Sequence, residues 1–292
     1  MAPRLISTTA VQRLLQERLA EMRQQGLDEA LTKLDLNADA AYASAVIDAL
    51  RASRFRLVRM PIVDCQSGDI YFEEILLRLF DPAGVVMPVF ESLMCLQRWN
   101  LLAEVTPFLL TLQLEYGRQL PNPTSINLPP SILQPSKQRD RLEVALETFV
   151  TKGGDARRVV LEITETAYVE PTPEVISFME ATAAKGYRWA LDDFGDGFHT
   201  YAHIEAMPLH YVKLSQEISE LLMQSESVPP EVDTALGLCR QLKLPIVAEH
   251  VPHRDDALKL QRQHGVKYAQ MGPLVGFEET GEGEAVIVLG ER

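Results

Sequence analysis

The sequence has few cysteines and no long apolar runs. Its three cysteines, Cys65, Cys95 and Cys239, lie far apart in the chain and lack the paired spacing of a zinc site. This usage argues against a disulfide framework and predicts a reducing compartment, the cytoplasm. No apolar run approaches the roughly 20 residues that span a bilayer, and the N-terminus lacks the apolar core of a signal peptide. We therefore expect a soluble protein without a membrane segment.

Basic residues are also scarce relative to acidic ones. The 292 residues include 28 Lys plus Arg against 41 Asp plus Glu, which gives a formal net charge of −13. Because nucleic acids and anionic membranes attract basic surfaces, this balance argues against DNA or RNA as a partner. The acidic residues either cover the surface as ordinary solvated side chains or are partly gathered at one place.

Residues 1–52 differ from the rest of the chain. Thr8 or Thr9 is placed to cap a first amphipathic helix that ends at Gly26, and residues 40–52 have the spacing of a second helix. These helices either pack on the main domain or form a linker or dimer contact. We expect an N-terminal helical segment at 1–52 and a barrel domain at 53–292.

After the first segment, short apolar runs alternate with longer amphipathic stretches. Helical spacing is clear at 171–184 and 233–242. Alternation of this kind, over about 240 residues, predicts an α/β fold, a TIM-like (β/α)8 barrel with an N-terminal helical segment. The eight runs that we expect to form strands are residues 55–64, 70–80, 125–128, 158–164, 188–194, 210–214, 245–250 and 266–276.

Polar residues interrupt these apolar runs, almost always at the late end. Any one of them alone is as well explained by a helix cap or a solvated turn. In a (β/α)8 barrel, however, the carboxyl ends of the strands meet at one mouth, where catalytic groups are found. The residues concerned are Glu74, Asn127, Glu162, Asp192, Asp193, Lys213, Glu249 and Gln270.

A buried cluster of these carboxylates would repel itself unless cations neutralised it. The set contains carboxylates and an amide but no Cys or His, which favours hard ions such as Mg²⁺ or Mn²⁺ over zinc. The adjacent Asp192 and Asp193 are suited to serving two neighbouring ions. Two ions of this kind are typical of phosphoryl chemistry, where they stabilise the attacking and leaving oxygens.

The motifs that surround these residues, taken together, resemble those of EAL-domain proteins, bacterial phosphodiesterases that cut the second messenger cyclic di-GMP. The resemblance runs from about Phe55 to Gly276 and implies an EAL-type barrel that hydrolyses one phosphodiester bond with a metal-activated water to give linear pGpG. It also implies a homodimer and allows an upstream sensor or partner protein. The matching motifs are EILLR (74–78), INL (126–128), LEITET (161–166), LDDFGDGF (191–198), YVKL (211–214), VAEHV (247–251) and Gln270.

The resemblance also implies a role for each matching residue. The implied catalytic residues are Lys213, which matches a lysine beside the attacking water, Glu249 and Gln270. The implied substrate-binding residues are Leu76, Arg78 and Asp193, and Glu165 matches a glutamate that holds the loop after Asp193. The implied ligands of two metal ions are Glu74, Asn127, Glu162, Asp192, Asp193 and Glu249.

The chain departs from the family pattern around these residues. A serine stands at 215, where the family has an aspartate near the metal site, and a methionine at 60, where it usually has a glutamine. Three hypotheses stay open: a working phosphodiesterase, a catalytically silent cyclic di-GMP receptor or protein-interaction module, and a barrel enzyme for another phosphate ester. The further departures are Ile75, His250, Pro252 and Met271.

Overall fold

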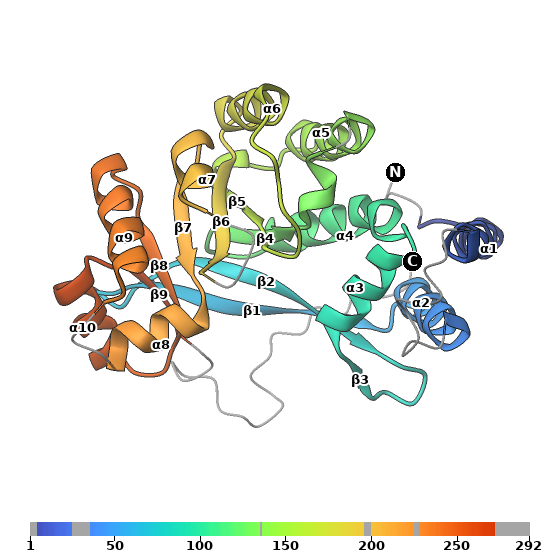
Figure 1. Cartoon of the computed structure of the whole chain (residues 1–292), viewed down its shortest axis with the longest axis horizontal. Helices are drawn as coiled ribbons and strands as arrows, with labels where there is room; N and C mark the ends of the chain where they lie inside the picture. The colour runs from blue at the N-terminus through green and yellow to red at the C-terminus, as the bar shows by residue number, and fades with distance from the viewer. Residues whose placement is uncertain (1–4, 25–35, 135, 196–199, 225–227, 272–292) are drawn as a thin grey trace. The chain divides into compact units, whose positions relative to one another are not determined.

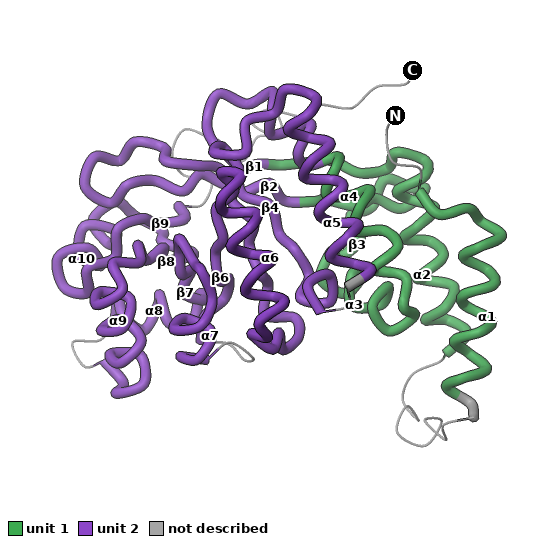
Figure 2. Tube along the Cα trace, turned by 90° about the horizontal axis from the view of Figure 1, so that it is seen from above, with its two compact units in different colours: residues 1–58, 77–112, 286–292 green, residues 59–76, 113–285 purple. Residues whose placement is uncertain are grey.

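The structure is a computed structural model that describes residues 5–24, 36–134, 136–195, 200–224 and 228–271. Its described residues divide into two compact units (Figure 2). Unit 1 consists of the described residues up to 58 and of residues 77–112. Unit 2 consists of residues 59–76 and of the described residues from 113 onward. The domain boundary expected after residue 52 stays a prediction.

Unit 1 contains both helices expected near the N-terminus. The first, α1, covers Thr8–Gln24, and the Gly26 expected to end it lies outside the described residues. The second, α2, covers Leu36–Arg51 and so begins four residues earlier than its apolar spacing indicated. The other elements that lie wholly or mainly in this unit are β3 (Val86–Met87), α3 (Val89–Arg98) and α4 (Leu102–Gly117).

One half-buried carboxylate, that of Asp39, joins α2 to α3. Asp39 accepts hydrogen bonds from Arg98 Nη2 at 2.6 Å and Nε at 3.1 Å, and from Trp99 Nε1 at 2.8 Å. Burial alone raises the pKa of the Asp39 carboxyl, but the hydrogen bonds from Arg98 and Trp99 outweigh burial and lower it below its ordinary value. The α2 helix is therefore packed within unit 1 by a charge-assisted network as well as by its apolar face.

Unit 2 is built around a closed barrel, as the alternation of runs predicts (Figure 1). The strand order is β1-β9-β8-β7-β6-β5-β4-β2, with β3 beyond β2, and pairing of β1 with β2 closes the ring. Each of the eight predicted runs contains a strand, and residues 272–276 of the last run lie outside the described residues. Their bounds are β1 Phe55–Asp64, β2 Ile70–Phe80, β4 Thr124–Leu128, β5 Val159–Ile163, β6 Arg188–Phe194, β7 Tyr211–Leu214, β8 Ile246–Val251 and β9 Tyr268–Met271. Both β1 and β2 contribute residues to each unit.

The first strand runs against the other seven. It pairs antiparallel with β9, with Ile62 opposite Gln270, whereas β2 and β4–β9 pair in parallel. The cause is the connection to β2, which spans only residues 65–69. A parallel crossover needs a dozen or more residues, so a link this short permits only a hairpin turn. Asp64 Oδ1 shapes that turn by accepting the backbone N–H groups of Gln66 and Ser67.

Helices connect the parallel strands (Figure 1). Of the two predicted from spacing, one begins at Pro173 after the capping residue Thr172, and the other begins at Pro230. Proline suits the first helical position because its fixed φ fits the helix and its missing N–H would have no partner there. The helices are α5 Ser136–Thr151, α6 Pro173–Ala184, α7 Tyr201–Ala206, α8 Gln216–Gln224, α9 Pro230–Leu242 and α10 Arg254–His264.

The barrel interior is apolar at the end where the parallel strands begin. Tyr71 and Tyr268 stack there with ring centroids 4.3 Å apart, and the Tyr211 hydroxyl donates to that of Tyr71. A buried cluster lies around these rings and leaves the opposite end of the barrel to polar groups. Its members are Ile62, Phe72, Val160, Ala190, Tyr211, Val247 and Tyr268.

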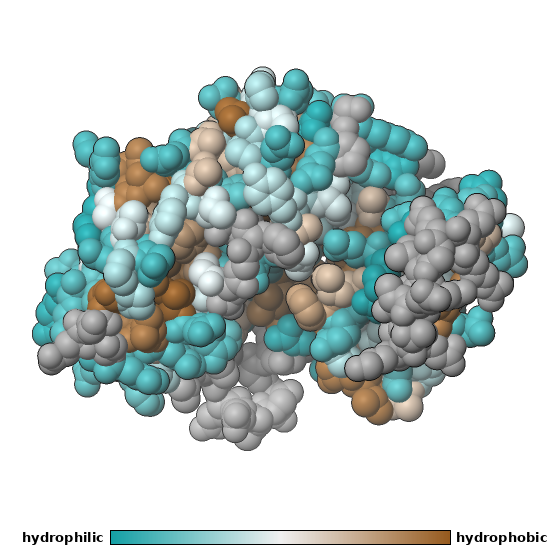
Figure 3. Space-filling view, viewed as in Figure 1, coloured by the Kyte–Doolittle hydropathy of each residue, from teal (hydrophilic) through white to brown (hydrophobic). Residues whose placement is uncertain are grey.

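Trp99 and Trp189 are fully buried core residues. The three cysteines are free and buried. None of the helices among the described residues combines the length and apolarity of a membrane span. The face drawn in Figure 3 is mostly hydrophilic, with hydrophobic residues in small patches.

Removal of the Asp39 carboxylate tests the packing of α2. We expect Asp39→Ala to lower the free energy of unfolding by about 2 kcal/mol, because Arg98 and the buried Trp99 lose the acceptor that they share. The matched control is Asp48→Ala, which removes an exposed ion pair with Arg51 on the same helix and should cost at most about 0.5 kcal/mol. Urea unfolding of both variants measures the difference, and equal stabilities would contradict a packing role for Asp39.

Candidate active site

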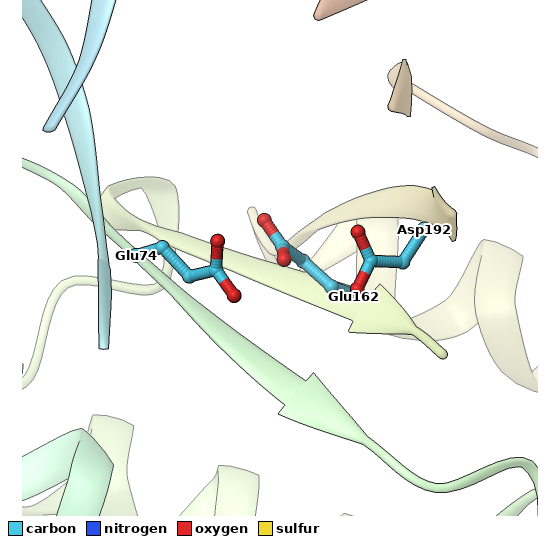
Figure 4. Close-up of side chains that lie close together, drawn as sticks. All are labelled: Glu74, Glu162 and Asp192. Carbon is cyan, nitrogen blue, oxygen red and sulfur yellow. The ribbon is translucent and has the colours of Figure 1, made fainter. Parts of the chain in front are cut away.

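Three strands place carboxylates at one end of the barrel. Glu74 comes from β2, Glu162 from β5 and Asp192 from β6, and Figure 4 shows the three side chains directed into a common space. One oxygen of each lies within 4.8 Å of the others. In a second group, formed by Asp192, Asp193 and Glu249, one oxygen of each residue also lies within 4.8 Å of the others. The two groups share Asp192, so the site consists of two adjacent clusters of oxygens.

Two β-bulges shape the second group. On β6 the register with β7 shifts between Leu191 and Phe194, and on β8 the register with β9 shifts between Ala248 and Val251. Each bulge contains a residue with left-handed backbone, Asp193 at φ 49° and His250 at φ 51°. A bulge adds one residue to a strand and changes the direction of the side chains beside it. In this way adjacent residues of one strand, Asp192 and Asp193, both belong to the second group.

A single ammonium group lies among the carboxylates. Lys213 Nζ is 2.6 Å from Asp192 Oδ1, 2.8 Å from Glu162 Oε2 and 3.2 Å from Glu74 Oε2. It also lies 2.8 Å from Glu249 Oε1. Only 1% of the lysine side chain is exposed, so these charges interact with little screening by water. Lys213 therefore links four of the five acidic residues of the site.

Two amide side chains orient Glu74. Asn127 Nδ2 donates to Glu74 Oε1, and Gln270 Nε2 donates to Glu74 Oε2, both at 2.7 Å. The first amide comes from β4 and the second from β9, so Glu74 is held from both sides of the barrel. Because each Glu74 oxygen already accepts an amide N–H, the direction of this carboxylate is fixed.

Two buried oxygens at the site have no hydrogen-bond partner among the described residues. They are Asn127 Oδ1 and Glu162 Oε1. A buried acceptor without a donor is costly, and native proteins normally satisfy it with a protein group, water or an ion. Both atoms are oxygens of types that Mg²⁺ and Mn²⁺ prefer. The residues therefore fit a divalent cation.

Burial strongly perturbs the titration of the acidic residues. It raises the pKa of Glu162 to about 8 and that of Glu249 to about 7, although Lys213 acts in the opposite direction. The pKa of Asp192 is also raised, first by burial and then by neighbouring carboxylates. For Lys213, burial alone would lower the pKa, but the surrounding carboxylates outweigh burial and raise it. These carboxylates thus need more positive charge nearby than one lysine supplies.

Glu73, the residue before Glu74 on β2, is a buried glutamate with partners of its own outside the site. It is as deeply buried as Glu74, but its Oε1 lies 3.1 Å from Arg59 Nη1 and its Oε2 accepts a hydrogen bond from Asn122. Successive side chains of a strand point to opposite faces, so Glu73 points away from the barrel interior. It has its own cationic partner, whereas Glu74 shares Lys213 with three other acids.

The other predicted residues lie as follows. Leu76 and Arg78 follow Glu74 on β2 and are both half-buried, and Arg78 Nη1 donates to the carbonyl of Leu77. Glu165 is half-buried after the end of β5, and the segment at 196–199 that it was expected to hold lies outside the described residues. The roles of all three stay predictions.

The departures from the family pattern differ in their surroundings. Ser215 is fully buried at the start of α8, where its Oγ accepts the N–H of Ile218. His250 and Pro252 are exposed. Met60 is half-buried and Ile75 and Met271 are buried in the strands β1, β2 and β9.

One site residue escaped the sequence analysis. Ser219 on α8 is fully buried, and its Oγ accepts the backbone N–H of Glu249 at 3.0 Å. The residues around Ser219 in the sequence have the apolar spacing of a helix, which predicts α8 but no contact with the site. No pattern in the sequence indicates that this helix approaches β8, so only the fold reveals the contact.

The chain resembles known proteins in sequence. The cyclic di-GMP phosphodiesterase PdeL of Escherichia coli K12 is 26% identical over 240 residues, which cover 77% of this chain and 63% of the relative. The chain covers still less of two further curated relatives, 14% and 23%. The chain thus spans less than two thirds of the length of these relatives.

Solved structures share the fold at low identity. The EAL enzyme Bd1971 in a cAMP-bound form has a TM-score of 0.72 and 18% identity, over 87% of this chain and 71% of that chain. The EAL domain of FimX from Pseudomonas aeruginosa, bound to c-di-GMP, has a TM-score of 0.64 and 19% identity, over 80% of this chain and 95% of that chain. The family model described as "EAL domain" matches residues 43–273, most of the sequence. The chain therefore belongs to the EAL domain family.

Proposed function

We propose that the protein hydrolyses one phosphodiester bond of cyclic di-GMP to give linear pGpG, with the help of two divalent cations, Mg²⁺ or Mn²⁺. The observation that carries the proposal is the pair of oxygen clusters that share Asp192. Relatives that are named cyclic di-GMP phosphodiesterases support the choice of substrate.

The net charge of the site supports the proposal that two divalent cations bind there. Five ionised carboxylates and one ammonium group leave four negative charges, which two divalent ions neutralise. Divalent ions bound there supply a field that acidifies water and stabilises negative charge developing on phosphate. In our proposal the residues that hold them are Glu74, Asn127, Glu162, Asp192 and Glu249, with Asp193 completing the second cluster.

Each remaining residue has a distinct proposed task. Lys213 offsets negative charge and orients the attacking water, since its ammonium group lies among the carboxylates. Gln270 keeps Glu74 in place through its 2.7 Å hydrogen bond. Leu76 and Asp193 contact the ligand, Arg78 contacts its phosphate, and Glu165 holds the loop that follows β6. We further propose a cytoplasmic homodimer with a barrel domain from residue 53, controlled by a sensor or partner protein.

The first test separates an enzyme from a silent receptor. The protein is incubated with cyclic di-GMP and Mg²⁺ or Mn²⁺, and the products are separated by chromatography. Glu74→Gln should reduce pGpG release at least about 100-fold, because it removes a charge from the metal cluster. Glu73→Gln is the matched control, a buried glutamate one residue away, and should retain activity in the folded fraction.

The outcomes of this test are distinct. Equal turnover by Glu74→Gln and the unchanged protein would remove the cluster from the mechanism. Binding of cyclic di-GMP without hydrolysis, in excess Mn²⁺, would favour the receptor function and contradict the proposed reaction.

The raised pKa values predict how stability varies with pH. Glu162 and Glu249 bind protons more tightly in the folded state than in the unfolded state, with pKa values of about 8 and about 7. In a chelating buffer, stability should therefore fall as the pH rises from 5 to 8. We expect a loss of at least about 1 kcal/mol, roughly 2–4 °C in melting temperature.

Thermal unfolding measures this change. Addition of Mn²⁺ at pH 8 should reverse it, since cations replace the lost protons. The variant Glu162→Gln should have a flatter profile in chelator than the unchanged protein. A melting temperature that does not fall between pH 5 and 8 would contradict the proposed burial of ionisable carboxylates.

Ser215 offers a test of what the missing family aspartate does. We expect Ser215→Asp to raise activity, because it adds a negative charge two residues after Lys213, directly beyond the end of β7. The helix should tolerate the change, since Asp and Ser cap helices about equally well. Ser215→Asn caps the helix without adding charge and should leave the rate unchanged. The measurement is the steady-state hydrolysis rate of each variant against that of the unchanged protein. A lower rate for Ser215→Asp would indicate that the site has adapted to serine.

A further inference from the structure

The second carboxylate cluster is assembled from two strands that are not neighbours. Asp192 and Asp193 lie on β6 and Glu249 lies on β8, with β7 between them. The β6–β7 register ends at Phe194 opposite Leu214, and the β7–β8 register ends at Leu214 opposite Ala248. Glu249 therefore lies one residue beyond the last pair. The pairing of β8 with β7 therefore does not fix the position of Glu249.

The first turn of α8 begins at this point. It directly follows β7, and the backbone N–H of Ser215 donates to the carbonyl of Phe194 at 3.2 Å. Gly195 allows close packing there, because a Cβ at this position would lie 2.5 Å from Ile218 Cγ1. Ser215 Oγ caps the turn by accepting the N–H of Ile218. The start of α8 is thus joined to the end of β6, next to Asp193.

The same turn also reaches β8 through Ser219. This side chain is fully buried, and its Oγ accepts the backbone N–H of Glu249 at 3.0 Å. The hydroxyl donates to the carbonyl of Leu214, at 3.4 Å. Because buried backbone N–H groups require an acceptor, Ser219 supplies to Glu249 what a strand partner would supply elsewhere. It does so at the start of the bulge that contains His250.

We propose that Ser219 is a positioning residue that fixes the Glu249 carboxylate relative to Asp192 and Asp193, and thereby sets the affinity of the second cluster for a divalent cation. This inference rests on the proposed binding of two cations. Ser219 acts through the backbone of Glu249 and does not itself offer a ligand atom to the cluster. The first cluster, formed by Glu74, Glu162 and Asp192, does not depend on it in this way.

The test is a calorimetric titration of the full chain with Mn²⁺. The unchanged protein should bind two ions. In Ser219→Ala we expect one ion to bind at least about 10-fold more weakly while the other keeps its affinity, the size of effect that residues supporting metal ligands typically show. Ser219→Thr retains the hydroxyl and should restore most of the affinity.

A matched serine controls for a general loss of stability. Ser92 is also fully buried in the first turn of a helix, where its Oγ donates to the carbonyl of Pro88 at 2.6 Å, but it lies in unit 1. Ser92→Ala should lower the melting temperature without changing either Mn²⁺ affinity. If Ser219→Ala does not fold, Ser219→Cys replaces it, since the thiol is a much weaker acceptor of similar size.

The outcomes distinguish this inference from the function on which it rests. If the unchanged protein binds two Mn²⁺ ions and the Ser219 variants bind both equally well, Ser219 has no positioning role. Equal weakening of both ions, or weakening by Ser92→Ala as well, would also overturn it. An unchanged protein that binds no Mn²⁺ contradicts the proposed function itself.

Discussion

The burial of several carboxylates around one ammonium group is the constraint on which the rest of the structure depends. Removing such charges from water costs several kcal/mol for each ion unless partners compensate. Lys213 compensates part of this cost by contacting four acids. The amides of Asn127 and Gln270 fix the direction of Glu74. A barrel suits this arrangement because five strands deliver these acidic and basic groups to one end, while the other end keeps an apolar core.

The bulges interrupt the regular alternation of side chains along β6 and β8. In a regular strand, adjacent side chains point to opposite faces, as Glu73 and Glu74 do on β2. Glu73 accordingly requires its own partner, Arg59. Where β6 has to direct two consecutive acids to one site, it gains an extra residue, and Asp193 takes a left-handed backbone that aspartate tolerates better than most residues. Backbone irregularity is therefore part of how the second cluster is made.

The sequence predicts the strands and the membership of the cluster well, because both follow from local patterns. All of the acids except Glu74 stand late in an apolar run, and a barrel brings such positions together. Other features depend on tertiary structure. The reversed direction of β1 follows from the short 65–69 connection, a length that the sequence itself contains. The contact between Ser219 and Glu249 depends on how α8 packs against β8, and no residue pattern encodes that packing or the two bulges.

The hydrogen bond between Gln270 and Glu74 joins residues 196 positions apart in the sequence. It lies where β9 completes the ring with β1, so it requires the first and last parts of the barrel to meet. Contacts of such long range are slow to form because the intervening chain must first lose its freedom. A folding intermediate with an open barrel would lack an oriented Glu74, even with β2, β4 and β5 already paired. Capture of a ligand that needs an oriented Glu74 would therefore report that the barrel has closed.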